Sequence, residues 1–180
     1  MRIISGTLKG RSLSVPKNFK GRPTTDFARE GLFNVLQNVM DMEGAQVLDL
    51  FAGTGSFSIE CFSRGAASLL CVEMNAQHAR FIRDNFRHFE IHHADVLLTD
   101  ALKFINHSHE KFDIVFADPP YDLPALPVLP DMILKKQMLK EDGILVLEHG
   151  NKINFEEHPA FMQHRKYSNV HFSFFRTSPS

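Results

Sequence analysis

The feature that most constrains this chain is a regular alternation of short apolar runs with longer helical patterns, which begins at residue 46. The runs with the length and composition of buried strands are 46–51, 68–73, 95–99, 112–117 and 143–149. Helical stretches are predicted between them at about residues 56–64, 77–89, 100–106 and 131–140. Nearly continuous apolar strands that alternate with helices are typical of a parallel sheet covered on both faces. The sequence therefore predicts an α/β fold.

Charge is distributed unevenly along the chain, although the formal net charge is only −1. Residues 1–22 carry six cationic and no acidic side chains, whereas residues 23–180 have a formal charge of −7. A basic segment on an acidic body favours contact with a polyanion, and the alternative is a solvated, charged hairpin. The basic side chains are Arg2, Lys9, Arg11, Lys17, Lys20 and Arg22.

The amino-terminal segment also has a local pattern of its own. Short extended runs at residues 2–5 and 12–15 flank glycines and predict a β-hairpin extension or a bent edge. A helix is expected to begin near Thr24 or Thr25, where a hydroxyl can cap the first N–H groups. Gly31 lies inside this helix and costs it about 1 kcal/mol relative to alanine.

The carboxyl-terminal segment departs from the alternating pattern as well. Residues 165–176 contain two β-rich runs around Ser168 and Asn169, which predicts a closing antiparallel hairpin. The expected organisation is a basic arm at residues 1–24 followed by one domain at residues 25–180.

The first turn after a predicted strand has the pattern of a ligand site, because ligands of open α/β sheets bind outside the carboxyl ends of the strands. Asp49 ends the strand, and Gly53 and Gly55 allow a tight turn before a helix at Ser56. Dinucleotide sites have a third small residue where this chain has Ser58, and Asp49 would repel a pyrophosphate. The same carboxylate would attract a cationic amino group, so the turn favours S-adenosylmethionine over NAD.

Two further carboxylates follow the next strands. Glu73 can accept both hydroxyls of a ribose, a role that S-adenosylmethionine and NAD sites share. Asp100 is expected to accept a hydrogen bond from an adenine amino group, with Asp95 as the alternative residue and a helix N-cap as the alternative role. The predicted cofactor-binding residues are Asp49, Phe51, Gly53, Gly55, Glu73, Met74, Asp100 and Ala101.

A rigid turn, Asp118-Pro119-Pro120-Tyr121, follows the apolar run at residues 112–117. The prolines fix φ and remove two N–H donors, and the alternative interpretation is simply a stiff loop. Asp118 and the Pro119 carbonyl could hold the hydrogens of a nucleobase amine, while Tyr121 stacks on the base, which contributes about 1–3 kcal/mol. Catalysis of methyl transfer would then depend mainly on alignment and electrostatics.

Taken together, these residues resemble class I S-adenosylmethionine-dependent methyltransferases that modify amines. More narrowly, most of residues 2–122 is similar to the RsmD family, in the segments RIISGTLKGRSLSVP, RPTTDFAREGLFNVL, VLDLFAGTGSFSIE, VEMN and DIVFADPPYD. The proline-rich segment YDLPALPVLPDMI and the chain past residue 150 depart from the family pattern.

The resemblance implies a Rossmann-like fold with a seven-stranded, mostly parallel sheet and S-adenosylmethionine as the methyl donor. It implies methylation of the N2 amine of a guanine in small-subunit (16S) ribosomal RNA, within the subunit or its assembly intermediate. It also implies that Arg22, Thr24 and Thr25 help to cover the cofactor and approach the RNA.

Two other functions remain open at this point. The same turn serves DNA adenine-N6 and cytosine-N4 methyltransferases, although 180 residues show no separate DNA-recognition domain. The third possibility is a catalytically silent nucleic-acid-binding module.

Other patterns are expected to be structural. Cys61 and Cys71 cannot form a disulfide framework, which predicts a cytoplasmic protein with reduced, buried thiols. No apolar run has the length of a membrane span, and the start of the chain lacks the apolar core of a signal peptide. We expect no metal, because the densest histidine clusters lack ligand spacing: His92, His93, His107 and His109.

Overall fold

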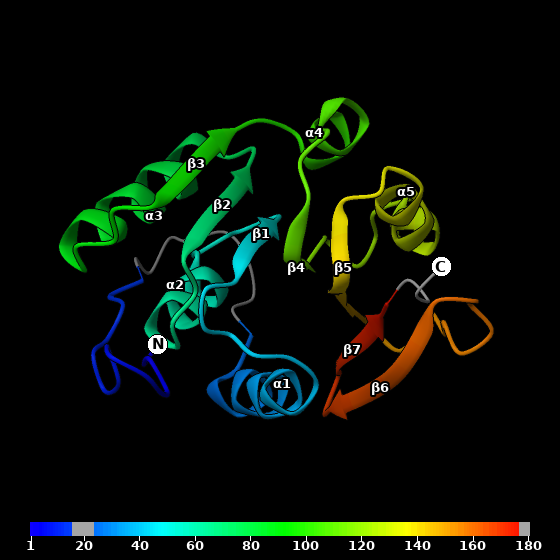
Figure 1. Ribbon diagram of the computed structural model, residues 1–180, viewed down its shortest axis with the longest axis horizontal. Coiled ribbons are helices and arrows are strands. Elements are labelled where there is room, and N and C mark those ends of the chain that lie inside the picture. Colours follow the sequence, from blue (N-terminus) through cyan, green and yellow to red (C-terminus); the bar gives the residue numbers. More distant parts are fainter. Residues whose placement is uncertain (16–23, 177–180) are drawn as a thin grey trace.

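The structure is a computed structural model that describes residues 1–15 and 24–176. Within these residues the strands form a seven-stranded sheet in the order β3-β2-β1-β4-β5-β7-β6 (Figure 1). Strands β1 to β5 pair in parallel, and β7 pairs antiparallel with both β5 and β6. The predicted α/β fold is therefore confirmed. The strands are β1 (Gln46–Leu50), β2 (Ser68–Glu73), β3 (Ala94–Leu98), β4 (Phe112–Ala117), β5 (Leu139–His149), β6 (Phe161–Tyr167) and β7 (Val170–Phe175).

Helices cover both faces of the sheet, with α1 and α2 on one side and α4 and α5 on the other (Figure 1). The apolar core is split in the same way, since Phe33 of α1 and Ile82 of α3 belong to one cluster and Ile105 of α4 and Ile133 of α5 to the other. None of the helices in the described residues is long and apolar enough to span a membrane. The helices are α1 (Asp26–Val39), α2 (Ser56–Ser63), α3 (Ala76–His88), α4 (Ala101–His107), the 3-10 helix η1 (Leu126–Val128) and α5 (Leu129–Lys135).

Helix α1 begins as the sequence predicts and continues through its glycine. The Thr25 hydroxyl accepts a hydrogen bond from the Ala28 amide at 3.2 Å and caps the helix. A Cβ at Gly31 would lie 2.1 Å from Cζ of Tyr167, a residue of β6. The glycine therefore gives up some helix propensity so that an aromatic ring of the sheet can pack closely against the helix.

The end of α5 differs from the prediction of a helix over residues 131–140 and a strand from residue 143. The helix ends at Lys135, and β5 already begins at Leu139. Gln137, with φ of 54°, turns the chain, and Leu139 then pairs with Phe112 of β4. Met138 and Leu139 are both buried, so burial of these apolar side chains outweighs local helix propensity.

The predicted carboxyl-terminal hairpin is present as β6 and β7. Its turn lies at Ser168 and Asn169, where Ser168 has a φ of 58°. The first strand begins at Phe161, earlier than the predicted start at residue 165.

The predicted amino-terminal hairpin is short: it consists of an isolated antiparallel bridge between Arg2 and Ser12, beside which the Ile3 amide donates to the Arg11 carbonyl at 2.8 Å. The carboxylate of Glu60, on α2, accepts hydrogen bonds from the amides of Ile4 at 2.8 Å and Ser5 at 3.0 Å. These amides are thereby paired with a helix side chain instead of a second strand. The buried apolar side chains of this segment are Ile3, Leu8 and Leu13.

The division into an arm at residues 1–24 and a domain at residues 25–180 stays a prediction. Residues 1–15 contribute to the same apolar cluster as α1 and α2. The predicted boundary adjoins residues 16–23, which lie outside the described part of the chain.

Candidate active site

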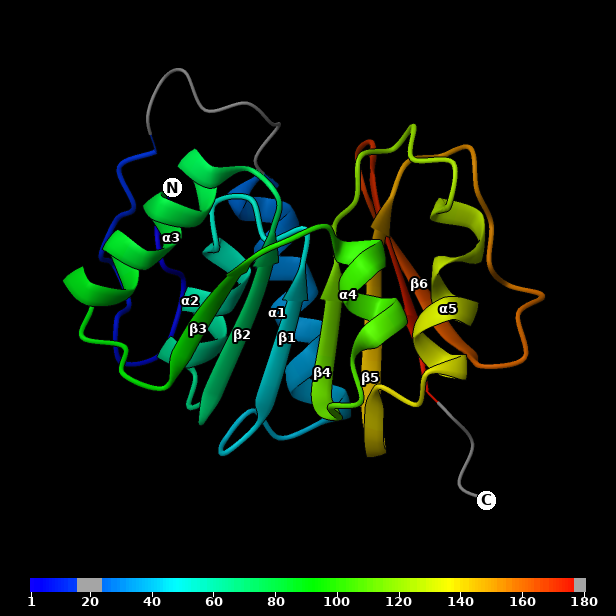
Figure 2. The same cartoon turned by 90° about the horizontal axis from the view of Figure 1, so that it is seen from above.

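The two turns singled out in the sequence meet at one edge of the sheet. Strand β1 lies between β2 and β4, and Leu50 at its end is in register with Ala117 at the end of β4. The amide of Asp118 donates to the carbonyl of Leu50 at 3.3 Å. Parallel strands point toward this edge (Figure 2), and β1 is where the strand order reverses, which is the usual ligand site of such sheets.

The turn after β1 has three residues in the left-handed region. Phe51, Gly53 and Gly55 have φ values of 62°, 55° and 70°. A Cβ at Gly53 would meet nothing closer than 3.8 Å, whereas one at Gly55 would lie 3.0 Å from Ile82 of α3. Gly55 is thus needed for helix packing, and Gly53 leaves an open approach to its backbone. Phe51 is a strained aromatic residue in this region, as is common at ligand sites.

Glu73 connects the end of β2 to this turn. Its Oε2 accepts from the Gly53 amide at 2.8 Å, and its Oε1 accepts from the Asn75 amide at 2.7 Å. Each carboxylate oxygen keeps a further lone pair, so the group can still accept two ligand hydroxyls. Met74, the next residue, is 70% exposed and offers an apolar surface beside that carboxylate.

Asp49 is enclosed beneath the glycine turn. Its side chain is buried, and its Oδ2 accepts a hydrogen bond from the Ser58 hydroxyl at 2.8 Å. Loss of solvent on burial raises the pKa of Asp49 to about 8, despite the Ser58 hydrogen bonds that favour the charged form. The sequence pattern drew attention to Ser58 only as a missing glycine, and the structure shows it as the partner of Asp49.

The two aspartates considered for the adenine contact, Asp100 and Asp95, lie at opposite ends of β3. Asp100 caps α4, since its Oδ1 accepts from the Lys103 amide at 2.9 Å. The N-cap interpretation therefore holds, while the hydrogen bond to adenine stays a prediction for its second oxygen. Ala101 is buried directly behind it. Asp95 lies near the start of β3 and is exposed, so it is away from the edge of the sheet where the two turns meet.

Glu148 joins the turn at residues 118–121 to the start of α1. The Tyr121 hydroxyl donates to its Oε1 at 2.9 Å, and the Thr24 hydroxyl donates to its Oε2 at 2.8 Å. Glu148 is 3% exposed, and Tyr121 is 46% exposed. Sequence reasoning missed Glu148, although a carboxylate at the end of a buried strand was the available signal.

Asp118 and Glu148 form a pair of neighbouring carboxyl groups. Ala117 of β4 is in register with Leu147 of β5, so the residues that follow them, Asp118 and Glu148, lie side by side. Because successive side chains point to opposite faces of a sheet, both carboxyl groups share the face opposite to Ala117 and Leu147. Burial, followed by the charge of Glu148, raises the pKa of Asp118 well above its ordinary value. Burial also raises the pKa of Glu148, against hydrogen bonds from Thr24, Tyr121 and Asp118 that favour its ionised form.

Not all of the predicted RNA-binding side chains lie at the edge of the sheet that carries the Asp118 turn. Arg2, Lys9 and Arg11 are exposed, and the Arg11 guanidinium lies 4.6 Å from the ring centroid of Phe89. The amide of Thr7 donates to the Ser63 carbonyl at 2.7 Å, which places that bend at the carboxyl end of α2, away from the Asp118 turn. Arg22 lies outside the described residues.

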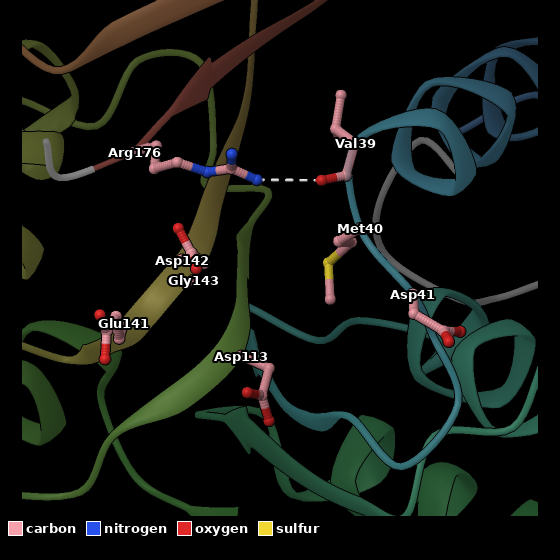
Figure 3. Close-up of a pocket in the computed structure, with 8 residues that line it drawn as sticks. All are labelled: Val39, Met40, Asp41, Asp113, Glu141, Asp142, Gly143 and Arg176. Atoms are coloured by element: carbon pink, nitrogen blue, oxygen red, sulfur yellow. Dashed lines mark hydrogen bonds between the residues drawn. The ribbon is translucent and has the colours of Figure 1, made fainter. Parts of the chain in front are cut away.

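Two cavities lie apart from the predicted site residues. One of about 450 Å³ is lined by Asp113, Glu141 and Arg176 among others. Figure 3 shows Arg176 directed at the carbonyl of Val39, to which it donates at 3.0 Å. Asp113 and Glu141 come from the starts of β4 and β5, so this cavity lies at the edge opposite to Asp118. The other, of about 150 Å³, is lined by residues that include His149, His164 and His171.

Within residues 1–15 and 24–176, no three His, Cys, Asp or Glu side chains are grouped so that they could hold a metal ion. Cys61 and Cys71 are buried and free. Burial raises the pKa of both thiols, which makes them poor nucleophiles.

Known proteins are similar to this chain over most of its length. A family model described as conserved hypothetical protein 95 matches residues 1–176. A protein of Bacillus subtilis (strain 168) is 37% identical over 161 residues, which cover 87% of this chain and 86% of that protein. Ribosomal RNA small subunit methyltransferase D of Escherichia coli (strain K12) is 34% identical over 148 residues, covering 82% of this chain and 74% of that one. A solved Escherichia coli structure has a TM-score of 0.85 and 29% identity, covering 97% of this chain and 96% of that chain.

Proposed function

Because the chain belongs to the RsmD family of class I S-adenosylmethionine-dependent methyltransferases, we propose that it methylates the N2 amine of a guanine in small-subunit ribosomal RNA. Relatives named as ribosomal RNA small subunit methyltransferase D support ribosomal RNA as the substrate. The Asp-Pro-Pro-Tyr turn supports an exocyclic nucleobase amine as the acceptor, and the choice of the guanine N2 amine rests on the resemblance to the RsmD family. The RNA is encountered within the small subunit or its assembly intermediate, and the protein acts in the cytoplasm.

One observation carries this proposal, namely the contact between the two turns. The Asp118 amide and the Leu50 carbonyl are 3.3 Å apart, so a donor bound over the glycine turn would lie beside the Asp118 turn. A methyl donor and an acceptor amine could then be held in one alignment, which is the main contribution an enzyme makes to a transfer of this kind.

The residues present fit S-adenosylmethionine. Gly53 leaves open space where a side chain would project, and Glu73 keeps lone pairs for the ribose hydroxyls. Met74 is exposed beside it, where it can contact the adenine ring. Asp49, buried beneath the glycine turn, is the carboxyl group assigned to the cationic amino end, whose charge would favour the ionised form of that carboxyl. When bound, S-adenosylmethionine supplies a methyl group already activated by its sulfonium centre.

The protein's own residues orient the acceptor amine. A carboxyl oxygen of Asp118 and the Pro119 carbonyl accept the two N–H bonds of the amine, which directs the nitrogen lone pair at the methyl carbon. Pro119 is buried and Pro120 is exposed, so the turn is anchored on one side and faces the substrate on the other. The exposed part of the Tyr121 ring stacks on the guanine.

The test is to incubate the protein with labelled S-adenosylmethionine and small ribosomal subunits that lack the modification, and then digest the RNA to nucleosides. Label is expected in N2-methylguanosine. Label in another nucleoside, or in DNA but not RNA, would overturn the proposal in favour of an adenine-N6 or cytosine-N4 enzyme. Binding without any transfer would identify a silent module.

A further inference from the structure

We propose that Glu148 is a positioning residue for methyl transfer and receives, through Asp118, the proton that the acceptor amine must lose. This inference rests on the proposed function of the site. It assigns a role to a buried carboxyl group that no part of the sequence pattern had singled out.

The geometry that supports this role is a convergence of three segments on one side chain. Thr24 precedes α1, Tyr121 follows β4, and both hydroxyls donate to opposite oxygens of Glu148 at 2.8 Å and 2.9 Å. Asp118, adjacent in the β4 and β5 register, shares a hydrogen bond with the same carboxyl. A 3% exposed carboxyl with this many donors is arranged to hold negative charge.

The hydrogen-bonding pattern indicates which carboxyl carries the proton before the reaction. Glu148 receives hydroxyl donors on both oxygens, and those bonds favour its ionised form. Asp118 is disfavoured as an anion by burial and by the Glu148 charge. The pair therefore holds one proton on Asp118, whose other oxygen remains available to the substrate amine.

The transfer then balances within the site. The new N–CH₃ bond forms as the S–CH₃ bond breaks, and the bonding electrons remain on sulfur in a neutral thioether. The methylated nitrogen gives its extra proton to Asp118 while the proton already on Asp118 passes to Glu148. The sulfonium charge and the negative charge of the pair disappear together, and the pair ends with two protons.

The groups that surround Glu148 determine the pH at which it can accept a proton. In the described part of the chain, the β7 residue in register with it is Phe172, which carries no charge. Arg165 of β6 is exposed and donates to the His164 carbonyl, and Asp49 acts on the neighbouring Asp118. The groups in direct hydrogen-bond contact are Thr24, Asp118 and Tyr121.

Removing the hydroxyl donors gives the sharpest test, because Tyr121→Phe keeps the aromatic ring and Thr24→Val keeps the side-chain shape. Each donor lowers the pKa of Glu148, so its loss raises that pKa. Single-turnover rates plotted against pH should show the acid limb displaced to higher pH in each variant, and by about one unit in the double variant. Tyr167→Phe, which removes a hydroxyl elsewhere on the sheet, should leave the limb unmoved. An acid limb that coincides with that of the wild type in the double variant would overturn the inference.

The carboxyl group that accepts the proton can also be removed. Glu148→Gln should lower the single-turnover rate at pH 7 on the order of 100-fold with KM for RNA unchanged, whereas Glu141→Gln, an exposed carboxyl on the same strand, should have no effect. A rate within about twofold of the wild type would contradict the proposal.

A carboxyl ¹³C NMR titration of the free protein measures the titration of Asp118 and Glu148 without any substrate. Glu148 should titrate above the ordinary glutamate range, and higher still in the Thr24→Val, Tyr121→Phe double variant. An ordinary titration in both proteins would overturn the inference even if guanine methylation is confirmed. Conversely, label in a nucleoside other than N2-methylguanosine would reject the proposed function and leave this titration as an independent result.

Discussion

At the scale of single residues, the burial of Asp49 makes a prediction about stability and pH. Its pKa is about 8 in the folded protein against 3.8 for the ordinary group, so the folded state keeps a proton that the unfolded chain releases. The resulting stabilisation is fully present below the ordinary pKa and is lost as the pH rises through the folded-state pKa. Within this window the loss is about 1.4 kcal/mol per pH unit.

Asp49→Asn removes this titration while its amide oxygen can still accept the Ser58 hydroxyl. We expect the difference in free energy of unfolding between wild type and variant to change steadily in favour of the variant as the pH rises from about 5 to 7. Urea unfolding at several pH values measures this difference. Asp95→Asn, at an exposed carboxylate, is the control, and a pH-independent difference for Asp49→Asn would contradict the assignment.

A second single-residue prediction concerns Asp118. Asp118→Ala removes one acceptor of the amine hydrogens, so we expect methyl transfer to fall about 100-fold or more. RNA affinity should change little, because the basic segment is separate from the turn. Single-turnover transfer and filter binding measure the two effects. Asp122→Ala, at an exposed carboxylate in the same loop, should retain activity, and equal losses in both variants would argue against a specific role.

At the scale of elements, the amino-terminal segment is held by contacts that distinguish its two glycines. Gly6 and Gly10 both have positive φ, of 80° and 84°. A Cβ at Gly6 would lie 1.6 Å from the Ser63 carbonyl oxygen of α2, whereas one at Gly10 would meet nothing within 4 Å. Alanine substitutions at these two glycines therefore separate the cost of backbone strain from the cost of steric contact.

We expect Gly10→Ala to cost about 1–2 kcal/mol of stability through left-handed strain alone. Gly6→Ala should cost at least about 2 kcal/mol more, because backbone atoms of α2 must move, and it should expose the segment to proteases. Urea unfolding and limited proteolysis measure these effects. Equal costs for the two variants would mean that the segment does not dock on α2.

At the scale of the whole molecule, the uneven charge predicts how RNA binding depends on salt. Lys9 and Arg11 are exposed in the basic segment. Replacing both with alanine should weaken RNA binding regardless of sequence and reduce the slope of log affinity against log salt by about 0.7–0.9 for each phosphate that the variant no longer neutralises. The control is the double variant Lys111→Ala, Lys135→Ala, which removes two exposed lysines toward the opposite edge of the sheet. Indistinguishable salt slopes in the two double variants would reject the segment as an RNA-binding surface.

Much of the molecule could be predicted from sequence because the signals are local. The α/β fold follows from apolar runs that alternate with helices, and the ligand edge follows from a glycine turn and a proline turn directly after strands. The cap at Thr25 and the turn at Ser168 are equally local. Each of these features depends on neighbouring residues whose backbone preferences are known.

The sequence by itself thus determined the fold, the two turns and the charge of the amino-terminal segment. The tertiary structure alone decided which carboxyl Thr24 would meet, 124 residues away at Glu148, and that Glu60 of α2 would take the amides expected in a hairpin. It also decided why Gly31 is a glycine, because the ring of Tyr167 occupies the space. Such contacts join residues far apart in the chain, and their energies depend on burial and register, which leave no periodic pattern in the sequence.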